Sequence, residues 1–390
     1  MRILFDGRVI QDHFPGIGRY AFNLALALRD LLRPNDALDV LVARSAKNTR
    51  YDLNALTSQT AQSGLAGVHV IPTDAAVFSP QTALGQLPAS KIDLAHFPYY
   101  IRPYVWRGAS VTTVYDMIPF LMPEALGSAR ARLTVRLLTA QAVRASRAIL
   151  TISNASRDDI ARFFPSAKNK ITVTPLAHDA MFCPQPPAEI ERIRAKFGLP
   201  ERFTLYIASN KPHKNLVRLV EAWKELVGYW VLGKGDQQPT TNNQQLIIAG
   251  HYDPRFPEAK TRVKELGLEQ NVRFIENVPN ADMPALYSAC ALFVYPSLYE
   301  GFGLTPLEAM ACGAPVICSN TSSMPEVMGE AGILVNPASP NEIAQACLRV
   351  LGDEALRGQL RAQSLARAAQ FSWRKTAEET IGVYRLVASG

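Results

Sequence analysis

The sequence predicts an α/β protein made of two doubly wound parallel sheets with helices on both faces. Three observations support this prediction. Short apolar runs alternate with amphipathic stretches along the chain, this alternation occurs in two series, and the proline-rich segment Phe182–Pro187 separates the two series. A length of 390 residues also favours two domains over one. We therefore expect one domain at residues 1–181 and a second at residues 182–372.

The two series of apolar runs give the expected strands. The first series predicts strands near Ile3–Phe5, Val40–Val42, Val68–Ile71, Leu94–Phe97, Val111–Tyr115, Ala148–Ile152 and Ile171–Thr174. The second series predicts strands near Leu205–Ala208, Leu246–Ala249, Val272–Ile275, Leu292–Tyr295, Val316–Cys318 and Ile333–Val335. Doubly wound sheets bind ligands at the carboxyl ends of their strands. We therefore expect two domains that face a central cleft.

Composition and charge indicate which ligands and which cellular compartment suit the protein. The net charge of +7 is modest and suits phosphorylated ligands or an anionic membrane surface as well as nucleic acid. The five cysteines form no Cys-x-x-Cys pair, and three of them lie in apolar stretches, which indicates a reducing compartment and buried thiols. No apolar run approaches the ~18 residues of a membrane span, and the chain starts as a strand without a signal-peptide pattern. We expect a cytoplasmic protein, with attachment to the inner face of the membrane left open.

The most informative stretch follows the apolar run that ends at Tyr295. It contains two carboxylates, Glu300 and Glu308, on either side of a glycine-bearing turn that leads into a helix. Glycines let a backbone approach a ligand closely, and the free N–H groups of a helix start suit a phosphate. Carboxylates in this position can accept hydrogen bonds from the hydroxyls of sugars and riboses. The turn and helix start comprise Gly301, Phe302, Gly303, Leu304 and Thr305.

This stretch resembles the Glu-x7-Glu signature of retaining nucleotide-sugar glycosyltransferases of family 4 (group 1), which have the GT-B fold of two Rossmann-like domains. The resemblance implies that Glu300 contacts the donor sugar and that Glu308 contacts the ribose. It suggests transfer of a hexose, with GDP-mannose ahead of UDP-hexoses as the donor. It also implies that a last helix at residues 373–390, opened by Phe371-Ser372-Trp373, crosses back to the first domain.

A second segment resembles the diphosphate-binding turn of the same family. It runs from Ser209 through Asn210 and Lys211 to Lys214, directly after the first strand of the second domain. The resemblance places Lys214 against the donor phosphates. Many members carry an arginine a few residues earlier, and Lys211 can replace it as a point charge. Strand-end positions that the resemblance assigns to the nucleotide base are Gly250, Asn277 and Val278.

A glycine pair near the N-terminus admits two interpretations. Gly16 and Gly18 match the dinucleotide fingerprint G-x-G-x-x-A literally. However, some ten residues separate them from the preceding strand, and no acidic residue ends the next strand, which Asp39 precedes and Arg44 follows. A nicotinamide or flavin site is therefore disfavoured. The resemblance instead implies a loop whose backbone N–H groups reach the donor phosphate and the acceptor, whereas a simple turn at a helix start is the structural alternative.

Two further residues of the first domain are candidates for catalysis. His96 and Asp116 each follow a buried run, so both are expected to emerge at the mouth of the cleft. His96 could contact the acceptor or take its proton, because histidine is the commonest general base, or it could be structural. Asp116 follows Tyr115 where the family usually carries a His-Asp pair. Tyr115 can donate a hydrogen bond but cannot titrate near neutrality.

The segment Ser128–Arg147 is expected to form a helix with a basic face. Five arginines fall within one arc of roughly 160° at 100° per residue, and Leu133 and Leu137 lie among them. Such a face is typical of a helix on anionic lipid, but also of an ordinary solvated helix. Nucleic acid is disfavoured, because no binding fold is recognised and aromatic residues do not interleave with the arginines. The arginines are Arg130, Arg132, Arg136, Arg144 and Arg147.

Together these features predict a retaining glycosyltransferase in which Glu300, Lys214, Asp116 and His96 are the catalytic candidates. The acceptor is expected to be a hydroxyl of a glycan or a lipid-linked sugar, as in polysaccharide biosynthesis. No Asp-x-Asp pair or His/Cys cluster is placed to hold a metal, so we expect no metal and no cofactor beside the nucleotide sugar, which is a co-substrate. Two alternatives remain open: a non-hydrolysing sugar-nucleotide epimerase, and a non-catalytic module that binds a sugar nucleotide.

Overall fold

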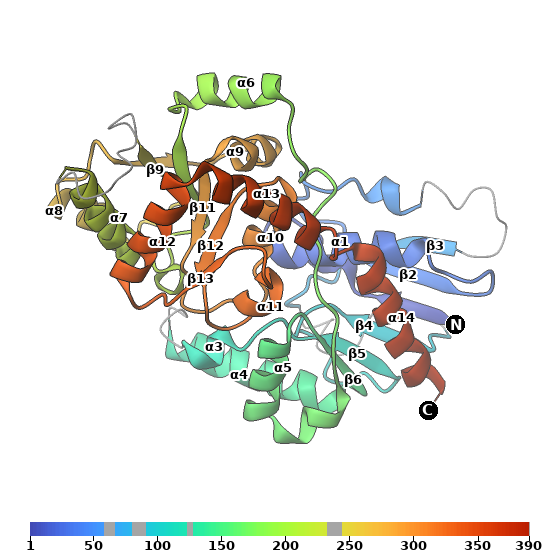
Figure 1. The fold of residues 1–390 in the computed structure, drawn as a ribbon. Coiled ribbons are helices and arrows are strands. Elements are labelled where there is room, and N and C mark those ends of the chain that lie inside the picture. The colour runs from blue at the N-terminus through green and yellow to red at the C-terminus, as the bar shows by residue number, and fades with distance from the viewer. Residues whose placement is uncertain (58–66, 80–90, 123–127, 232–243, 390) are drawn as a thin grey trace. The chain divides into compact units, whose positions relative to one another are not determined.

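The structure is a computed structural model that describes residues 1–57, 67–79, 91–122, 128–231 and 244–389. The chain forms two compact units (Figure 1). The first comprises Met1–Leu176 together with Ser372–Gly390, and the second comprises Ala177–Phe371. The second unit therefore begins five residues before the boundary that the sequence suggests at 182 (182 − 177 = 5).

The first unit contains a seven-stranded parallel sheet in the order β3-β2-β1-β4-β5-β6-β7. All four residues of β4, β5 and β6 are buried, as expected for a parallel sheet with both faces covered. The strands are β1 (Arg2–Phe5), β2 (Ala37–Ala43), β3 (Gly67–Thr73), β4 (Leu94–Phe97), β5 (Ser110–Thr113), β6 (Ala148–Thr151) and β7 (Ile171–Val173).

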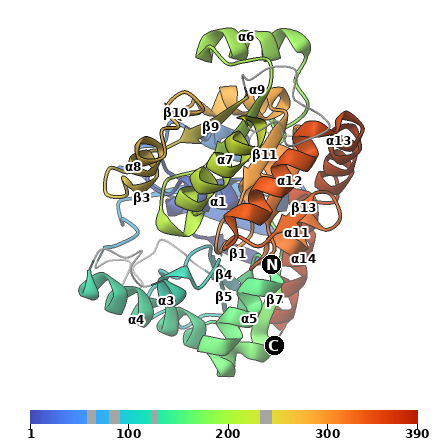
Figure 2. The same ribbon diagram turned by 60° about the vertical axis from the view of Figure 1, so that its left-hand side comes forward.

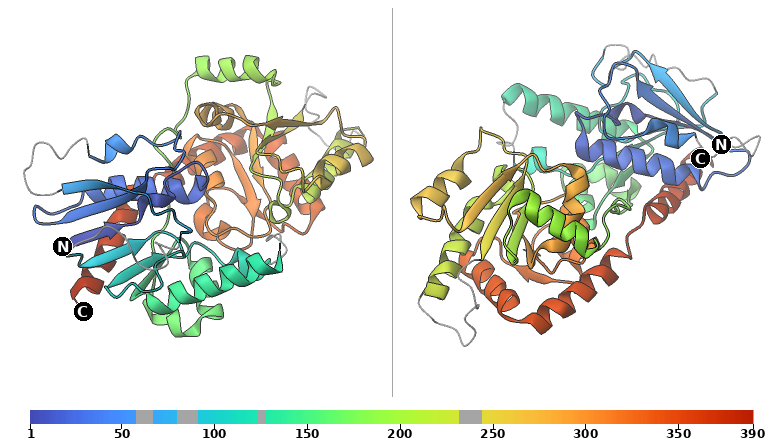
Figure 3. Two further views of the ribbon diagram at one scale, coloured as in Figure 1. Left: turned by 180° about the vertical axis from the view of Figure 1, so that it is seen from behind. Right: turned by 90° about the horizontal axis from the view of Figure 1, so that it is seen from above.

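The described helices of the first unit include the last helix of the chain. This helix, α14, packs on α1 and contacts β4, β5 and β6 (Figure 3), and the Thr376 hydroxyl donates a 2.6 Å hydrogen bond to the Pro175 carbonyl. Ser128 and Ser153 cap α4 and α5, as serines do at helix starts. The helices are η1 (Gly7–Val9), α1 (Pro15–Arg29), η2 (Leu53–Leu56), α3 (Ile118–Leu121), α4 (Ala129–Ala145), α5 (Asn154–Phe163), η5 (Pro165–Lys170) and α14 (Trp373–Ser389).

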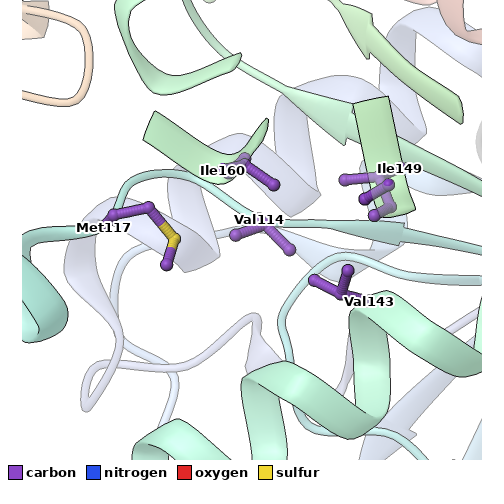
Figure 4. Close-up of a cluster of buried hydrophobic side chains, with 6 residues drawn as sticks. Val114, Met117, Val143, Ile149 and Ile160 are labelled. Atoms are coloured by element: carbon purple, nitrogen blue, oxygen red, sulfur yellow. The ribbon is translucent and has the colours of Figure 1, made fainter. Parts of the chain in front are cut away.

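One core cluster of this unit is shown in Figure 4. Side chains from the β5–α3 segment and from β6 meet side chains of α4 and α5. Burying a side chain of this size contributes about 1.5–3 kcal/mol, so the cluster fixes both helices against the sheet. Its labelled members are Val114, Met117, Val143, Ile149 and Ile160.

The second unit contains a six-stranded parallel sheet in the order β10-β9-β8-β11-β12-β13 (Figure 2). Helices α7 and α12 lie side by side, as do α10 and α13. The strands are β8 (Phe203–Ile207), β9 (Gln245–Gly250), β10 (Val272–Glu276), β11 (Leu292–Tyr295), β12 (Val316–Ser319) and β13 (Ile333–Val335). The helices are α6 (Pro187–Phe197), η6 (Pro212–Lys214), α7 (Leu216–Val231), α8 (Glu258–Glu265), η7 (Asn280–Asp282), α9 (Met283–Ala289), α10 (Leu304–Ala311), α11 (Met324–Met328), α12 (Pro340–Gly352) and α13 (Glu354–Ala368).

The two sheets share one topology. Each begins with an inner strand, β1 or β8, adds two strands on one side and then continues on the other side with β4 or β11. This reversal creates a topological switch point, where doubly wound sheets bind ligands at the carboxyl ends of their strands. The predicted fold of two doubly wound parallel sheets is confirmed, and each predicted strand corresponds to an observed one. Strand ends differ from the predicted ends by at most a few residues, as in β8, expected at Leu205–Ala208.

Candidate functional site

The acidic turn of the second unit lies between β11 and α10. Gly303 has φ = 115°, a conformation that side-chain-bearing residues rarely adopt, and a Cβ atom there would overlap with Met324 Cε. The Ser323 hydroxyl donates to the carbonyls of Glu300 and Phe302 at 2.9 and 2.6 Å. The neighbouring Ser322 hydroxyl accepts the Glu300 N–H at 3.0 Å. The turn is therefore held rigidly, with the Glu300 side chain fixed at the carboxyl edge of the sheet.

Lys214 binds directly to the Glu300 carboxylate. Its Nζ lies 2.6 Å from Glu300 Oε1 and donates a second hydrogen bond of 2.9 Å to Tyr295 Oη. The Lys214 and Glu300 side chains are only 14% and 12% exposed. The Leu298 N–H donates to the His213 carbonyl at 2.8 Å, which ties the β8–α7 turn to the acidic turn. A partly desolvated, hydrogen-bonded ion pair of this kind is stronger than one on an open surface.

Tyr295 is the buried residue that accepts the second hydrogen bond of Lys214. Its ring is stacked between those of Tyr206 and Phe293, with centroid distances of 5.6 and 5.9 Å. Burial raises the pKa of Tyr295 well above its usual range, and the Glu300 and Glu308 carboxylates raise it further. The hydroxyl is therefore neutral and close enough to both carboxylates to respond to them.

Glu308 lies in the helix that follows the turn. It is 4% exposed, and the Tyr287 hydroxyl donates to its Oε2 at 3.4 Å. No side chain in the described part of the chain caps the start of α10, which opens at Leu304 and Thr305 after the glycine. The first N–H groups and the positive end of this helix therefore point toward the acidic turn, an arrangement that suits a phosphate.

The turn after β8 contains one buried side chain that holds a neighbouring loop and two side chains that solvent reaches. The Asn210 amide is 8% exposed and donates to the carbonyls of Asp253 and Phe256 at 2.8 and 2.7 Å. Its oxygen accepts the Asp253 N–H at 2.7 Å, so this side chain holds the β9–α8 loop in place. Ser209 is half-buried and Lys211 is exposed. A direct contact with a ligand therefore stays a prediction for Ser209 and Lys211, whereas the Asn210 side chain has a positioning role.

The remaining predicted residues of this unit lie at neighbouring strand ends. Gly250 ends β9 with φ = 129°, and a Cβ atom there would overlap with the Ala208 carbonyl. Asn277 has φ = 56° just after β10, and its N–H donates to the Gly250 carbonyl at 3.3 Å. Val278 follows and is buried. These positions share the carboxyl edge of the parallel sheet with Lys214 and Glu300, because all of the strands run in one direction.

In the first unit, the predicted position of His96 at a strand end is wrong. His96 is the third residue of β4 and has no exposed surface. Its Nδ1 is 2.5 Å from Tyr384 Oη and its Nε2 is 2.8 Å from Thr113 Oγ1. Burial lowers the pKa of His96 to about 3, so the imidazole is neutral. Its geometry therefore supports a role in holding α14 against the sheet rather than in catalysis.

The other candidates of the first unit occupy loops and a helix start. Gly16 and Gly18 lie in the first turns of α1 rather than in a separate loop. Gly16 is exposed with open space around it, whereas a Cβ atom at Gly18 would lie 2.9 Å from the Val9 carbonyl oxygen. Asp116 is half-buried, and its Oδ1 accepts the Ile118 N–H at 2.9 Å. Tyr115 donates to the Pro98 carbonyl at 2.7 Å.

Comparison with known proteins identifies the family. A family model described as glycosyl transferases group 1 matches residues 189–367. The O-antigen chain mannosyltransferase B of Escherichia coli is 31% identical over 395 residues, covering 99% of this chain and 100% of the relative. The chain belongs to the group 1 glycosyltransferases. Another relative of this glycosyltransferase, the serotype-specific mannosyltransferase WbdA of Escherichia coli, is 33% identical over 292 residues, 73% of this chain, and the match covers 34% of that protein.

Solved structures show that this glycosyltransferase has the GT-B fold. A sucrose-phosphate synthase from Thermosynechococcus elongatus superposes with a TM-score of 0.72 and 21% identity, and the match covers 100% of both chains. Alr3699/HepE of Anabaena, in complex with UDP and glucose, superposes with a TM-score of 0.70 and 20% identity over 98% of this chain and 99% of that one. The family and fold that the Glu-x7-Glu motif suggests are therefore confirmed.

Sequence reasoning missed the residues that hold the glycosyltransferase site together. Tyr295 accepts a hydrogen bond from Lys214 and bonds to Glu300, and Ser323 fixes the turn. The position of Tyr295 as the last residue of a buried strand was a usable signal, whereas nothing marks Ser323 by spacing. Among the described residues, no group of three His, Cys, Asp or Glu side chains could hold a metal ion. No helix in the described part of the chain is long and apolar enough to cross a membrane.

Proposed function

We propose that this glycosyltransferase transfers mannose from GDP-mannose to a hydroxyl of a glycan or lipid-linked acceptor, with retention of configuration and without a metal ion. The observation that carries the proposal is the Lys214–Glu300 ion pair beside the start of α10, in a chain 31% identical to a protein named O-antigen chain mannosyltransferase B. In this ion pair the Lys214 ammonium and the Glu300 carboxylate lie 2.6 Å apart. A sugar linked to a phosphate can use both groups, because its phosphate binds a cation and its hydroxyls donate hydrogen bonds to a carboxylate.

The cation is assigned to the donor diphosphate. A lysine ammonium carries three protons, and two of them are directed at Glu300 Oε1 and Tyr295 Oη. In the described part of the chain, no third acceptor is bonded to Nζ, so one proton is available to a phosphate oxygen. The leaving nucleoside diphosphate gains negative charge as the glycosidic bond breaks. Lys214 and the N–H groups at the start of α10 then stabilise the charge that develops in the transition state.

The two acids are assigned to hydroxyls. Glu300, on the rigid turn, accepts hydrogen bonds from the transferred sugar, and Glu308, in the first turns of α10, accepts them from the ribose. Retention follows if the acceptor hydroxyl attacks the anomeric carbon on the face from which the diphosphate departs. In that step the C–O bond to the phosphate breaks, the new glycosidic bond forms, and the leaving phosphate oxygen takes the acceptor proton.

The direct test combines ligand screening with product analysis. At a hundredfold its dissociation constant, GDP-mannose should stabilise the protein by about 2.7 kcal/mol, and UDP-glucose and ADP-glucose should stabilise it less. The E300Q variant should still be stabilised by GDP but should lose transfer. Proton NMR of the product should show the α-anomer, and EDTA should leave the rate unchanged. Conversion of the sugar nucleotide without any acceptor would contradict the proposal in favour of an epimerase, and binding without turnover would leave a binding module.

We also propose that the first unit binds an anionic membrane surface through α4. Leu133 and Leu137 are 59% and 61% exposed, and the five arginines of this helix and its end are all exposed. Exposed leucines within a basic face suit the boundary between headgroups and acyl chains. A lipid-linked acceptor would be presented at such a surface.

A further inference from the structure

Four aromatic rings form a buried row beside the acidic turn of the second unit. The Tyr295 ring is stacked between those of Tyr206 and Phe293, and the Tyr287 ring meets Phe293 edge-on at a centroid distance of 5.4 Å. No residue of this row is more than 1% exposed. Phe293 occupies its place without a hydroxyl, so the packing of the rings does not require one. A buried hydroxyl costs free energy unless it is hydrogen-bonded, so each tyrosine is explained by what its hydroxyl binds. We call these four residues the aromatic row.

The Tyr295 hydroxyl joins three segments of the site at one point. Its oxygen accepts from Lys214 Nζ at 2.9 Å, and the hydroxyl also bonds to the Glu300 carboxylate and to the Thr305 hydroxyl. Lys214 comes from the β8–α7 turn, Glu300 from the acidic turn and Thr305 from the first turn of α10. An ionised carboxylate can only accept, so Tyr295 donates its proton to Glu300. This hydroxyl therefore fixes the cation, the first acid and the helix start relative to one another.

The Tyr287 hydroxyl holds the second acid. Tyr287 lies on α9, which packs on α10, and its hydroxyl donates to Glu308 Oε2 at 3.4 Å. The length of this hydrogen bond marks it as a weak one. The Tyr206 hydroxyl has a different partner, because it donates to the Ser209 backbone carbonyl, also at 3.4 Å. Two of the three tyrosines of the aromatic row thus bind an acid of the site, and the third binds the backbone.

We propose that two residues of the aromatic row, Tyr295 and Tyr287, are positioning residues of the transfer reaction. Tyr295 orients Glu300 and Lys214. Tyr287 orients Glu308. The inference rests on the proposed function, which assigns Glu300 to the sugar, Lys214 to the diphosphate and Glu308 to the ribose.

The two hydroxyls differ in the kinetic constant that each one controls. Groups that stabilise charge in the transition state need close placement, and a displacement of about 1 Å can lower a rate about 10²-fold. The hydroxyl of Tyr295 therefore acts mainly on kcat. The contact with the ribose is the same before and during the reaction, so weakening it reduces binding rather than kcat. The hydroxyl of Tyr287 therefore acts mainly on KM.

Phenylalanine variants keep each ring and remove only its hydroxyl. Initial rates over a range of GDP-mannose concentrations should show that Y295F lowers kcat about 10- to 100-fold. Y287F should raise KM about 3- to 10-fold, the size of one weak hydrogen bond, and change kcat less. Y206F is the matched control, because it loses a buried hydroxyl of the same row, and both constants should stay within about twofold of the wild-type values. Loss of packing alone would lower melting temperatures without separating kcat from KM.

Binding of the nucleotide alone separates this inference from the proposed function, because it needs no transfer. Calorimetry with GDP, UDP and ADP identifies the nucleotide that the wild-type protein binds. Y287F and Y295F should bind it about 3- to 10-fold more weakly than the wild type, and Y206F should bind it equally well. Weaker binding by Y287F and Y295F in a protein that transfers no sugar supports the inference and contradicts the proposed function.

Four results would overturn the inference. The wild type binds none of the three nucleotides, Y287F binds the nucleotide as the wild type does, Y206F loses as much affinity as Y287F, or the kcat of Y295F stays within about twofold of the wild-type value.

Discussion

The two sheets have the same topology but carry different chemistry at their carboxyl edges. In the second unit, the strand-end residues Lys214 and Glu300 form an ion pair whose side chains are 14% and 12% exposed. In the first unit, the loops after the strands carry four aromatic side chains in ring contact, of which Phe78 is 65% exposed. These residues are Phe14, Phe78, Tyr99 and Tyr100. Charge–charge contacts gain strength when water is excluded, whereas an aromatic face needs to be accessible to stack on a ligand. The two edges therefore differ in charge and in exposure, although the strand order that forms them is the same.

The largest expected effect concerns the Lys214–Glu300 ion pair of the second unit. Replacing Lys214 with alanine removes the cation assigned to the leaving diphosphate and leaves Glu300 unpaired. We expect kcat to fall about 10²- to 10³-fold, as when other groups that stabilise transition-state charge are removed. Initial rates with saturating sugar nucleotide measure the effect, and the exposed Lys211→Ala variant is the matched control, with a smaller loss. If the rate of the K214A variant stayed within threefold of the wild-type rate, Lys214 would have no part in stabilising the leaving diphosphate.

The second prediction compares one buried histidine in each unit. Burial lowers the pKa of His213 to about 4, with Lys214 and Lys211 adding to the effect and Glu300 opposing it. Burial lowers the pKa of His96 to about 3. In the unfolded chain both histidines have a pKa of about 6.5. Below that pH the unfolded state therefore binds protons that the folded state does not. Stability should therefore be complete above about pH 6.5 and fall as the pH decreases toward 4 and then 3.

The loss of stability depends on the difference between the pKa values of each histidine in the unfolded and folded states. For His213 a difference of about 2.5 pKa units corresponds to about 3 kcal/mol between pH 6.5 and pH 4. Melting temperatures measured across this range should fall for the wild-type protein. The H213Q variant cannot take up a proton at this position. Its melting temperature for the second unit should therefore depend less on pH than that of the wild-type protein. Parallel profiles for wild type and H213Q would show that other groups cause the acid sensitivity.

The third prediction compares the glycines at two helix starts. Gly303 has φ = 115°, and an alanine there would also overlap with Met324 Cε. G303A should lower the free energy of unfolding by about 1–3 kcal/mol, and adding M324A should relieve the overlap but not the backbone strain. Gly16 has open space around it, so G16A should change stability by less than about 1 kcal/mol. Chemical denaturation measures both variants, and equal losses would show that the two helix starts are equivalent.

The sequence predicted the fold well because buried parallel strands appear as short apolar runs, which are visible locally. It also named Lys214 and Glu300 as candidates on neighbouring loops, but not their ion pair, because 86 residues separate them and the contact depends on how β8 and β11 pair. His96 was misplaced for a related reason. Its partner Tyr384 is 288 residues away, and without it a histidine within an apolar run resembles a residue that leaves the strand.

The four aromatic side chains of the first unit show the same limit of sequence-based prediction. Phe14, Phe78, Tyr99 and Tyr100 lie in three separate loops, and none is unusual by itself. Only the strand order brings these loops together, because β4 pairs with β1 and β1 with β2, which in turn pairs with β3. Arg102, two residues after Tyr100, is buried and donates to Ser110 and Ser146. Loop positions alone therefore did not reveal which residues line the edge.

The smallest expected effect concerns α4 and tests whether the first unit binds anionic membranes through this helix. Replacing Leu133 and Leu137 with serine removes the exposed apolar side chains but keeps the arginines. Partitioning onto vesicles that contain phosphatidylglycerol should weaken several-fold, and replacing Arg132 and Arg136 with alanine should weaken it by about 1 kcal/mol per arginine. Neither variant should alter transfer to a water-soluble acceptor, because α4 does not carry the strand-end residues. Equal partitioning onto neutral phosphatidylcholine vesicles would show that the basic face contributes nothing. Partitioning that neither pair of substitutions weakens would show that α4 is an ordinary solvated helix.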